Sequence, residues 1–155
     1  MAKLKLGNKV PDFSLPRTGG GTWSLKDSAG SKLVLYFYPR DMTSGCTRES
    51  QDFRDLVPAF RRARTAILGI SRDSLASHER FVAKESLPFA LLADTEEKVC
   101  RMFDVIRQKS LYGRKYLGVE RSTFLVDEAG RLQQEWRNVK VPGHAEAVLE
   151  AAQRQ

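Results

Sequence analysis

The sequence predicts an α/β fold in which a mixed β-sheet lies between layers of helices. Short apolar runs rich in β-branched and aromatic residues alternate with segments whose apolar residues recur at helical spacing. Near the C-terminal end, two strand-like runs flank a glycine-containing turn, which adds an antiparallel pair to the sheet. Because 155 residues without a repeat or a linker can bury one sizeable core, we expect a single domain over residues 1–155.

The first part of the chain predicts a hairpin, a buried strand and a helix. Residues 12–15 and 22–25 are expected to pair as short strands through a turn at residues 19–21, which are all glycine. Residues 32–38 are predicted as a buried strand because 33–37 are all apolar. A helix is expected over residues 46–64, and Pro58 should kink or divide it because proline supplies no backbone donor.

The remaining elements continue this alternation. Strands are expected over residues 65–71 and 89–93, with a helix between them that opens near Ser74. Asp94 or Thr95 can cap a short helix after the second of these strands. Residues 122–127 and 131–136 flank a turn at 128–130 and predict a β-hairpin. A last helix is expected from about Pro142, with His144 exposed on its surface.

The chain places a cysteine at the junction between the strand over residues 32–38 and the helix that follows. Cys46 therefore lies at a helix N-terminus, where unpaired amide groups and the helix dipole favour a negative charge. The thiolate is the nucleophilic form of cysteine. This position predicts a reactive thiol.

Composition argues against several other classes of protein. A net charge of +7 raises nucleic acid as a partner, but the densest basic cluster, at residues 61–64, ends the predicted helix, where cations complement the dipole. We therefore expect no nucleic-acid partner. No apolar run is long enough to span a bilayer, and the N-terminus lacks the apolar core of a signal peptide, so we expect no membrane partner and a cytoplasmic location, or a mature chain without its leader.

Metal binding is also not expected. The potential soft ligands are scattered singly along the chain, without the close pairs that structural zinc sites use: Cys46, His78, Cys100 and His144. Two cysteines are likewise too few for a disulfide framework. We expect no metal and no other cofactor.

The pattern Pro39-x-x-x-Thr43-x-x-Cys46 resembles the active-site signature of the peroxiredoxins, and it follows the first long core strand, as in that family. The resemblance covers nearly the whole chain, including residues 10–15, 37–41, 67–73, 91–94 and 121–127. The most similar subgroup is the Q-type peroxiredoxins, also called bacterioferritin comigratory proteins. This resemblance implies a thioredoxin-like sandwich fold and a thiol-dependent peroxidase that reduces hydrogen peroxide and organic hydroperoxides.

The chemistry of peroxide cleavage gives each signature residue a role. Cys46 would attack one peroxide oxygen and become a sulfenic acid, while the other oxygen leaves with negative charge. The Thr43 hydroxyl can face the peroxide and the thiolate, cap the helix, or do both. Pro39 can shape the loop and shield the thiolate from water, and the backbone amides of Gly45 and Cys46 can donate to the peroxide oxygens.

Two charged residues complete the expected site. The resemblance places Arg121 at the family's active-site arginine, where its guanidinium would stabilise both the thiolate and the charge on the leaving oxygen. Spacing alone would leave it one arginine among many. Glu49 is a possible supporting residue, which could orient an arginine or simply favour the first helical turn by its charge.

The sequence departs from the family in ways that bear on mechanism. Ser44 stands where most members have proline, which could loosen the loop or let Ser44 cap the helix. Many Q-type members carry a resolving cysteine five residues after the nucleophile, where this chain has Gln51, or on the next helix near Val82. Cys100 is the only other cysteine, and its apolar neighbours favour a packed, inert thiol over a resolving one. We therefore expect a one-cysteine mechanism.

Other functions remain open from the sequence. A thioredoxin-type disulfide oxidoreductase normally has Cys-x-x-Cys, but the third residue after Cys46 is Glu49. A redox sensor or holdase that switches on Cys46 oxidation would have nearly the same sequence, because sensing also needs an accessible thiolate. The expected partners are a peroxide and an external reductant, either thioredoxin, glutaredoxin or a low-molecular-weight thiol, and the resemblance favours a monomer.

Overall fold

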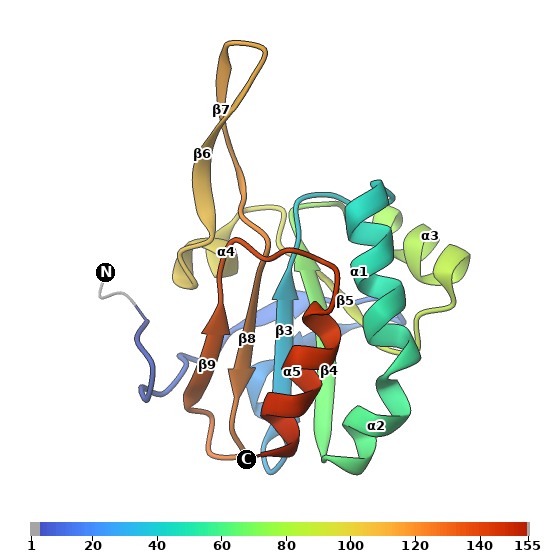
Figure 1. Cartoon of the computed structure of the whole chain (residues 1–155), viewed down its shortest axis with the longest axis vertical. Coiled ribbons are helices and arrows are strands. Elements are labelled where there is room, and N and C mark those ends of the chain that lie inside the picture. Colours follow the sequence, from blue (N-terminus) through green and yellow to red (C-terminus); the bar gives the residue numbers. More distant parts are fainter. Residues whose placement is uncertain (1–3, 155) are drawn as a thin grey trace.

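The computed structural model describes residues 4–154 and has a five-stranded mixed sheet at its centre (Figure 1). The strand order is β5-β4-β3-β8-β9, with bounds Leu91–Ala93, Thr65–Ser71, Lys32–Phe37, Ser122–Val126 and Leu132–Trp136. β3 pairs in parallel with β4 and antiparallel with β8, β4 pairs in parallel with β5, and β8 pairs antiparallel with β9. The predicted mixed sheet and C-terminal hairpin are both confirmed.

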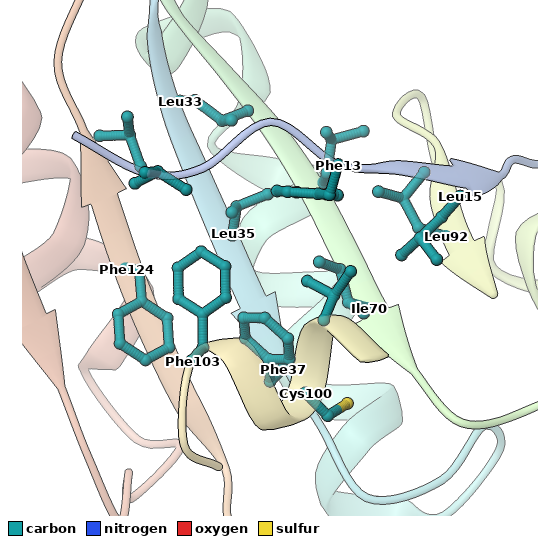
Figure 2. Close-up of a cluster of buried hydrophobic side chains, with 14 of the residues drawn as sticks. Phe13, Leu15, Leu33, Leu35, Phe37, Ile70, Leu92, Cys100, Phe103 and Phe124 are labelled. Atoms are coloured by element: carbon teal, nitrogen blue, oxygen red, sulfur yellow. The ribbon is translucent and has the colours of Figure 1, made fainter. Parts of the chain in front are cut away.

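The sheet separates two apolar layers, because successive side chains of a strand point to opposite faces. Leu33, Leu35 and Phe37 of β3 face the layer formed with the N-terminal segment and the short helix α4, Lys98–Met102 (Figure 2). Val34 and Tyr36 face the other layer. The helices that contribute buried residues to this second layer are α1 (Ser44–Asp55), α2 (Val57–Arg62), α3 (Leu75–Glu85) and α5 (His144–Gln153). The arrangement is the predicted sandwich.

Helix boundaries around the first long helix follow from Pro58. α1 ends at Asp55 and α2 begins at Val57, with the proline in the first turn of α2, where its missing donor costs no helical hydrogen bond. The predicted division of the helix is confirmed. The helix begins at Ser44, two residues earlier than expected, so Cys46 is its third residue.

The N-terminal hairpin is confirmed, with small shifts at its ends. β1 (Ser14–Pro16) and β2 (Thr22–Ser24) pair antiparallel with Leu15 opposite Trp23, and a 3-10 turn, η1 (Leu25–Ser28), follows. The N-cap position of α4 is Glu97, in the left-handed region with φ 64°, and not Asp94 or Thr95. The Asp94 side chain nevertheless caps the helix as expected, because its Oδ2 accepts a hydrogen bond of 2.7 Å from the amide of Cys100, the third helical residue.

One hairpin was not predicted. β6 (Ile106–Leu111) and β7 (Arg114–Val119) pair only with each other and project from one end of the molecule (Figure 1). Tyr112 and Gly113 form the connecting turn, both with positive φ, which matches the twist of an antiparallel pair. The strands lack apolar alternation because most of their side chains are not buried, so the periodicity that reveals a half-buried strand is missing.

The prediction of an exposed His144 is wrong. This residue begins α5 and is only 7% exposed, with its ring edge-on to Phe53 and Trp136. Its Nε2 is 2.7 Å from Thr123 Oγ1. Burial, followed by the charge of Arg121, lowers the pKa of His144 to about 4, so the side chain is neutral near pH 7.

Within residues 4–154, none of the helices combines the length and apolar character required to cross a membrane.

Candidate active site

The site is built at the carboxyl end of β3, where the chain turns into α1. Cys46 is in the first turn of α1 and is 1% exposed, and its neighbour Gly45 is half-buried. The first amides of a helix have no partner within the helix and carry partial positive charge. The fold therefore presents the Cys46 sulfur in surroundings that favour an anion.

Arg121 reaches this cysteine from the far end of the sequence. Its Nη2 donates to Cys46 Sγ at 3.4 Å, across a separation of 75 residues. The contact follows from the sheet, because β8 begins at Ser122, which is opposite Phe37 near the end of β3. The structure thus brings together Cys46 and Arg121, the two residues to which the family resemblance gave catalytic roles.

Glu49 holds the other side of the guanidinium. Arg121 Nη1 donates to Glu49 Oε1 at 2.7 Å, and the Glu49 side chain is 2% exposed. Burial raises the pKa of Glu49 to about 7, against the opposing effect of the Arg121 charge. Burial works in the other direction on Arg121, but the charges of Glu49 and Cys46 outweigh it and raise the pKa of the arginine. Glu49 therefore has the geometry of an orienting residue.

Gly45 leaves room for the guanidinium. A Cβ atom at this position would lie 3.1 Å from Arg121 Nη2, closer than ordinary van der Waals contact. The backbone conformation of Gly45 does not require glycine, since its φ is not positive. Its small size is what the site uses.

The structure places Thr43 and Pro39 in the loop before the helix. Thr43 occupies the N-cap position, but its hydroxyl does not cap the helix and instead donates to the Arg40 carbonyl at 2.9 Å. The expected side-chain cap is therefore wrong. Ser44 is the first helical residue and not the cap, and Pro39 is half-buried immediately after Tyr38.

A buried hydrogen-bond network, which was not predicted, ties this loop to α3. His78 Nδ1 is 2.8 Å from Asp41 Oδ2, and its Nε2 is 3.0 Å from the Leu92 carbonyl. Tyr38 and Ser77 hydroxyls also donate to the Asp41 carboxylate, at 2.6 and 2.8 Å. Burial alone would raise the pKa of Asp41, but the hydrogen bonds from His78 and Tyr38 outweigh it and lower the pKa. A usable signal was the spacing of His78 three residues before Phe81, which puts both on the buried face of one helix.

Three side chains of this region have the spacing of a metal site. Potential ligand atoms of Asp41, Asp73 and His78 lie within 4.8 Å of one another. Asp73 Oδ2 accepts hydrogen bonds from the Asp41 amide and the Ser71 hydroxyl. These oxygens already have protein donors, which explains the cluster as a hydrogen-bond network that holds the loop.

Cys100 lies in the other apolar layer. It is fully buried in α4, beside Phe37, Phe103 and Ile70 (Figure 2), whereas Cys46 belongs to the layer on the opposite face of the sheet. Burial, and then the charge of Asp94, raises the pKa of the Cys100 thiol far above its ordinary value. The two free cysteines are thus separated by the central sheet.

Comparison with known proteins agrees with this geometry. The model of the AhpC/TSA family matches residues 6–135. Peroxiredoxin Bcp of Xanthomonas campestris is 50% identical over 150 residues, covering 97% of this chain and 94% of that protein. Peroxiredoxin Bcp of Bacillus subtilis is 47% identical over 147 residues, covering 95% and 94%.

A solved structure extends the similarity to three dimensions. Xanthomonas campestris peroxiredoxin Q is similar with a TM-score of 0.91 at 49% identity, covering 98% of this chain and 96% of that chain. The thioredoxin-like fold expected from the resemblance is confirmed. A chain matched over most of its length by the family model, with relatives this similar, belongs to the AhpC/TSA family and, within it, to the Q-type peroxiredoxins, the bacterioferritin comigratory proteins.

Proposed function

We propose that this peroxiredoxin reduces hydrogen peroxide and organic hydroperoxides through Cys46, by a one-cysteine mechanism completed by an external thiol. The observation that carries the proposal is the 3.4 Å hydrogen bond from Arg121 to Cys46 Sγ, at the first turn of a helix. A permanent cation and unpaired amides both favour the thiolate there. They also face the region where negative charge develops on the leaving oxygen.

The reaction balances without a cofactor. The Cys46 thiolate attacks one peroxide oxygen, the O–O bond breaks, and the second oxygen leaves as an alcohol or water after taking a proton, which leaves Cys46 as sulfenic acid. One external thiol then displaces water to form a mixed disulfide. A second thiol releases Cys46 as the thiol and leaves with the disulfide. In this scheme Glu49 orients Arg121, and Gly45 leaves space for it.

Organic hydroperoxides are included because of a similar protein. The Xanthomonas campestris bacterioferritin comigratory protein, which is 48% identical to this chain, has alkyl peroxide reduction activity according to the description of its structure.

The one-cysteine mechanism is favoured over resolution by Cys100. The sheet lies between the two thiols, and a disulfide needs Cα atoms within about 7 Å of each other. The Cys100 side chain would therefore have to leave its core before it could reach Cys46. A sensor or holdase that uses the same thiol is the second candidate, because the site geometry suits either role.

The test measures how many equivalents of peroxide each protein molecule consumes. Wild-type protein should consume many equivalents of peroxide when dithiothreitol is present, and Cys46→Ser should consume none while keeping its circular dichroism spectrum, since serine is far less nucleophilic at neutral pH. Consumption of a single equivalent by wild type would favour the sensor. Undiminished turnover in Cys46→Ser would sink the assignment of the nucleophile.

We expect this reaction to take place in the cytoplasm, because thiol reductants are kept in their reduced form there. We expect a monomer, which analytical ultracentrifugation of the reduced protein can test. Rates with thioredoxin, glutaredoxin and a low-molecular-weight thiol should identify the reductant.

A further inference from the structure

The β6–β7 hairpin, residues 106–119 including its turn, carries only positive charges. It contains four cations, Arg107, Lys109, Arg114 and Lys115, and no acidic residue, although the chain as a whole has 19 acidic residues against 26 basic ones. Arg107 is paired with Asp104 at the base of the hairpin, but no ion pair to Arg114 or Lys115 occurs within residues 4–154. The projecting tip is therefore strongly positive.

The same hairpin concentrates exposed apolar surface. Of the six large apolar side chains that are exposed within residues 4–154, four lie here: Leu111 at 57%, Tyr112 at 97%, Tyr116 at 46% and Leu117 at 54%. Single exposed apolar residues are ordinary, but a cluster of them marks an interaction surface. Tyrosine and arginine are also the residue types that carry most binding energy at protein interfaces.

The strand register brings these two properties onto one face. Arg114 is opposite Leu111, and Tyr116 is opposite Lys109, so these four side chains share one side of the hairpin. A Cβ on Gly118 would meet both Lys109 Cδ and Tyr116 Cε2, at 3.1 and 3.2 Å, which shows that these side chains lie over the glycine. Leu111, Tyr112, Arg114, Lys115 and Tyr116 also line a surface hollow at the tip.

This face is continuous with the active site. Lys109 Nζ donates to the Val119 carbonyl at 2.7 Å, and two residues later Arg121 contacts Cys46. Burial, and then the charges of Arg121 and Arg72, lowers the pKa of Lys109. The hairpin rises from the end of the sheet at which β3 turns into α1 (Figure 1).

We propose that the β6–β7 hairpin is the docking surface for an acidic protein dithiol, which reduces oxidised Cys46. This proposal rests on the proposed function, because it names the partner in the second half of that reaction. A second copy of the chain is a poor occupant, since it would oppose four cations to four cations. Nucleic acid and anionic lipid match the charge but bring no thiol to the site.

The reaction of the docked partner is a simple exchange. One partner thiolate attacks the sulfur of the Cys46 sulfenic acid, the S–O bond breaks, and the oxygen leaves as water after protonation. The second partner thiol then attacks the mixed disulfide, which returns the Cys46 thiol and leaves the partner as an intramolecular disulfide. A small thiol completes the same steps without the hairpin.

A charge-reversal experiment tests the proposal. Peroxide reduction is measured with an acidic thioredoxin, kept reduced by its reductase and NADPH, and separately with dithiothreitol. The double variant Arg114→Glu, Lys115→Glu should lower kcat/KM for thioredoxin about tenfold at low salt, with a smaller difference at high salt. Its rate with dithiothreitol should equal that of wild type, because both positions lie on the exposed tip.

Two further variants distinguish the effect of the protein's overall charge from that of direct contact between the hairpin and thioredoxin. Arg61→Glu, Arg62→Glu makes the same change in net charge at the exposed end of α2, and it should leave kcat/KM for thioredoxin within about twofold of wild type if long-range attraction is screened. Tyr112→Asn removes the most exposed ring and keeps a residue suited to the turn, so its loss of kcat/KM should be independent of salt.

Several results would overturn the proposal. One is an equal loss in the hairpin and α2 double variants, or no loss in the hairpin variant. Another is a hairpin variant that loses affinity for a fluorescent single-stranded oligonucleotide or for vesicles containing phosphatidylserine, yet keeps wild-type thioredoxin kinetics. Failure of the wild type to consume peroxide with dithiothreitol would overturn the proposed function itself, and the docking proposal with it.

Discussion

Arg121 is held between the Cys46 sulfur and the Glu49 carboxylate, each of which accepts a hydrogen bond from a different nitrogen of its guanidinium. The fixed fork of arginine makes this possible, since its donors point in set directions. Glu49 Oε2 has no hydrogen-bond partner within residues 4–154, so Arg121 is the one described donor to this buried carboxylate. Loss of the arginine would therefore remove the positive charge beside the Cys46 sulfur, and it would also leave the buried Glu49 carboxylate without its described donor.

Arg121→Ala should lower the second-order rate of Cys46 oxidation by about 10²–10³, the usual cost of one preorganised donor at an anion site. Alkylation of Cys46 by iodoacetamide at pH 7 should also be slower, because the positive charge beside the sulfur is gone. Arg121→Lys keeps the charge but not the fixed fork of donors, so it should recover the alkylation rate more than the peroxide rate. Wild-type behaviour of Arg121→Ala in both assays would reject the assignment.

Single residues of the site were predictable to different degrees. The reactive position of Cys46 was predictable, because local periodicity reveals the buried strand and the helix between which it lies. Arg121 does not, because nothing in its neighbourhood indicates a partner 75 residues away; only the family resemblance placed it. The contact between Asp41 and His78 was not predicted, because the two residues are far apart in the sequence. A polar residue on the apolar face of a helix does not by itself indicate which residue it bonds to.

At the scale of elements, the Asp41–His78 contact joins the loop before α1 to α3. His78→Ala should lower the free energy of unfolding by about 1–3 kcal/mol, because it removes the buried hydrogen bonds of the imidazole to the Asp41 carboxylate and the Leu92 carbonyl. It should also slow Cys46 oxidation, since the loop is then less firmly held. Denaturant unfolding and stopped-flow peroxide kinetics measure the two effects.

Arg80 provides the matched control for this helix. It is exposed two residues after His78, so Arg80→Ala should change stability by less than about 0.5 kcal/mol. A His78→Ala protein as stable and as reactive as Arg80→Ala would contradict the role of the network.

The position of α4 makes a prediction for Cys100. Cys100→Ala should cost about 1 kcal/mol of stability, comparable with other single-group deletions in a core, and should leave turnover with dithiothreitol unchanged. After one equivalent of peroxide, mass spectrometry of the non-reduced wild type should find Cys46 as sulfenic acid or a thiol adduct. Excess peroxide should then give sulfinic acid. A Cys46–Cys100 peptide as the main product would overturn the one-cysteine mechanism.

Elements with a buried face were predictable, and those without one were not. Every strand of the central sheet and both parts of the helix divided at Pro58 are apolar enough to show their period. The β6–β7 hairpin depends on its backbone ladder and a two-residue turn, so its side chains are free to be polar and carry no pattern.

At the scale of the whole molecule, two buried groups give stability opposite dependences on pH. The pKa of Glu49 rises from 4.5 to about 7, so its contribution is present below pH 4.5 and is lost as the pH rises through 7. The pKa of His144 falls from 6.5 to about 4, so its contribution is present above pH 6.5 and is lost as the pH falls through 4. The two trends oppose each other between pH 4.5 and 6.5.

Single variants should expose these opposed trends. In Glu49→Gln only the His144 effect remains, so the free energy of unfolding should increase between pH 4 and 6.5 more steeply than in wild type. In His144→Asn only the Glu49 effect remains, so the free energy of unfolding should decrease as the pH rises from 4.5 to 7, without the opposing increase that His144 gives in wild type. Each full change is on the order of 3 kcal/mol. Urea unfolding across the pH range measures the slopes, and parallel curves for all three proteins would contradict both assignments.

The separation of Cys46 and Cys100 by the sheet has a practical consequence for handling the protein. A bond between these sulfurs requires one apolar layer to open, which happens rarely in a folded molecule and readily in an unfolded one. The fraction of chains carrying this intramolecular disulfide in an oxidised preparation therefore records how many have unfolded since they were made. In the absence of added thiol, a non-reducing mass spectrum would therefore serve as a marker of conformational damage, readable long after the heat, storage or freezing that caused it.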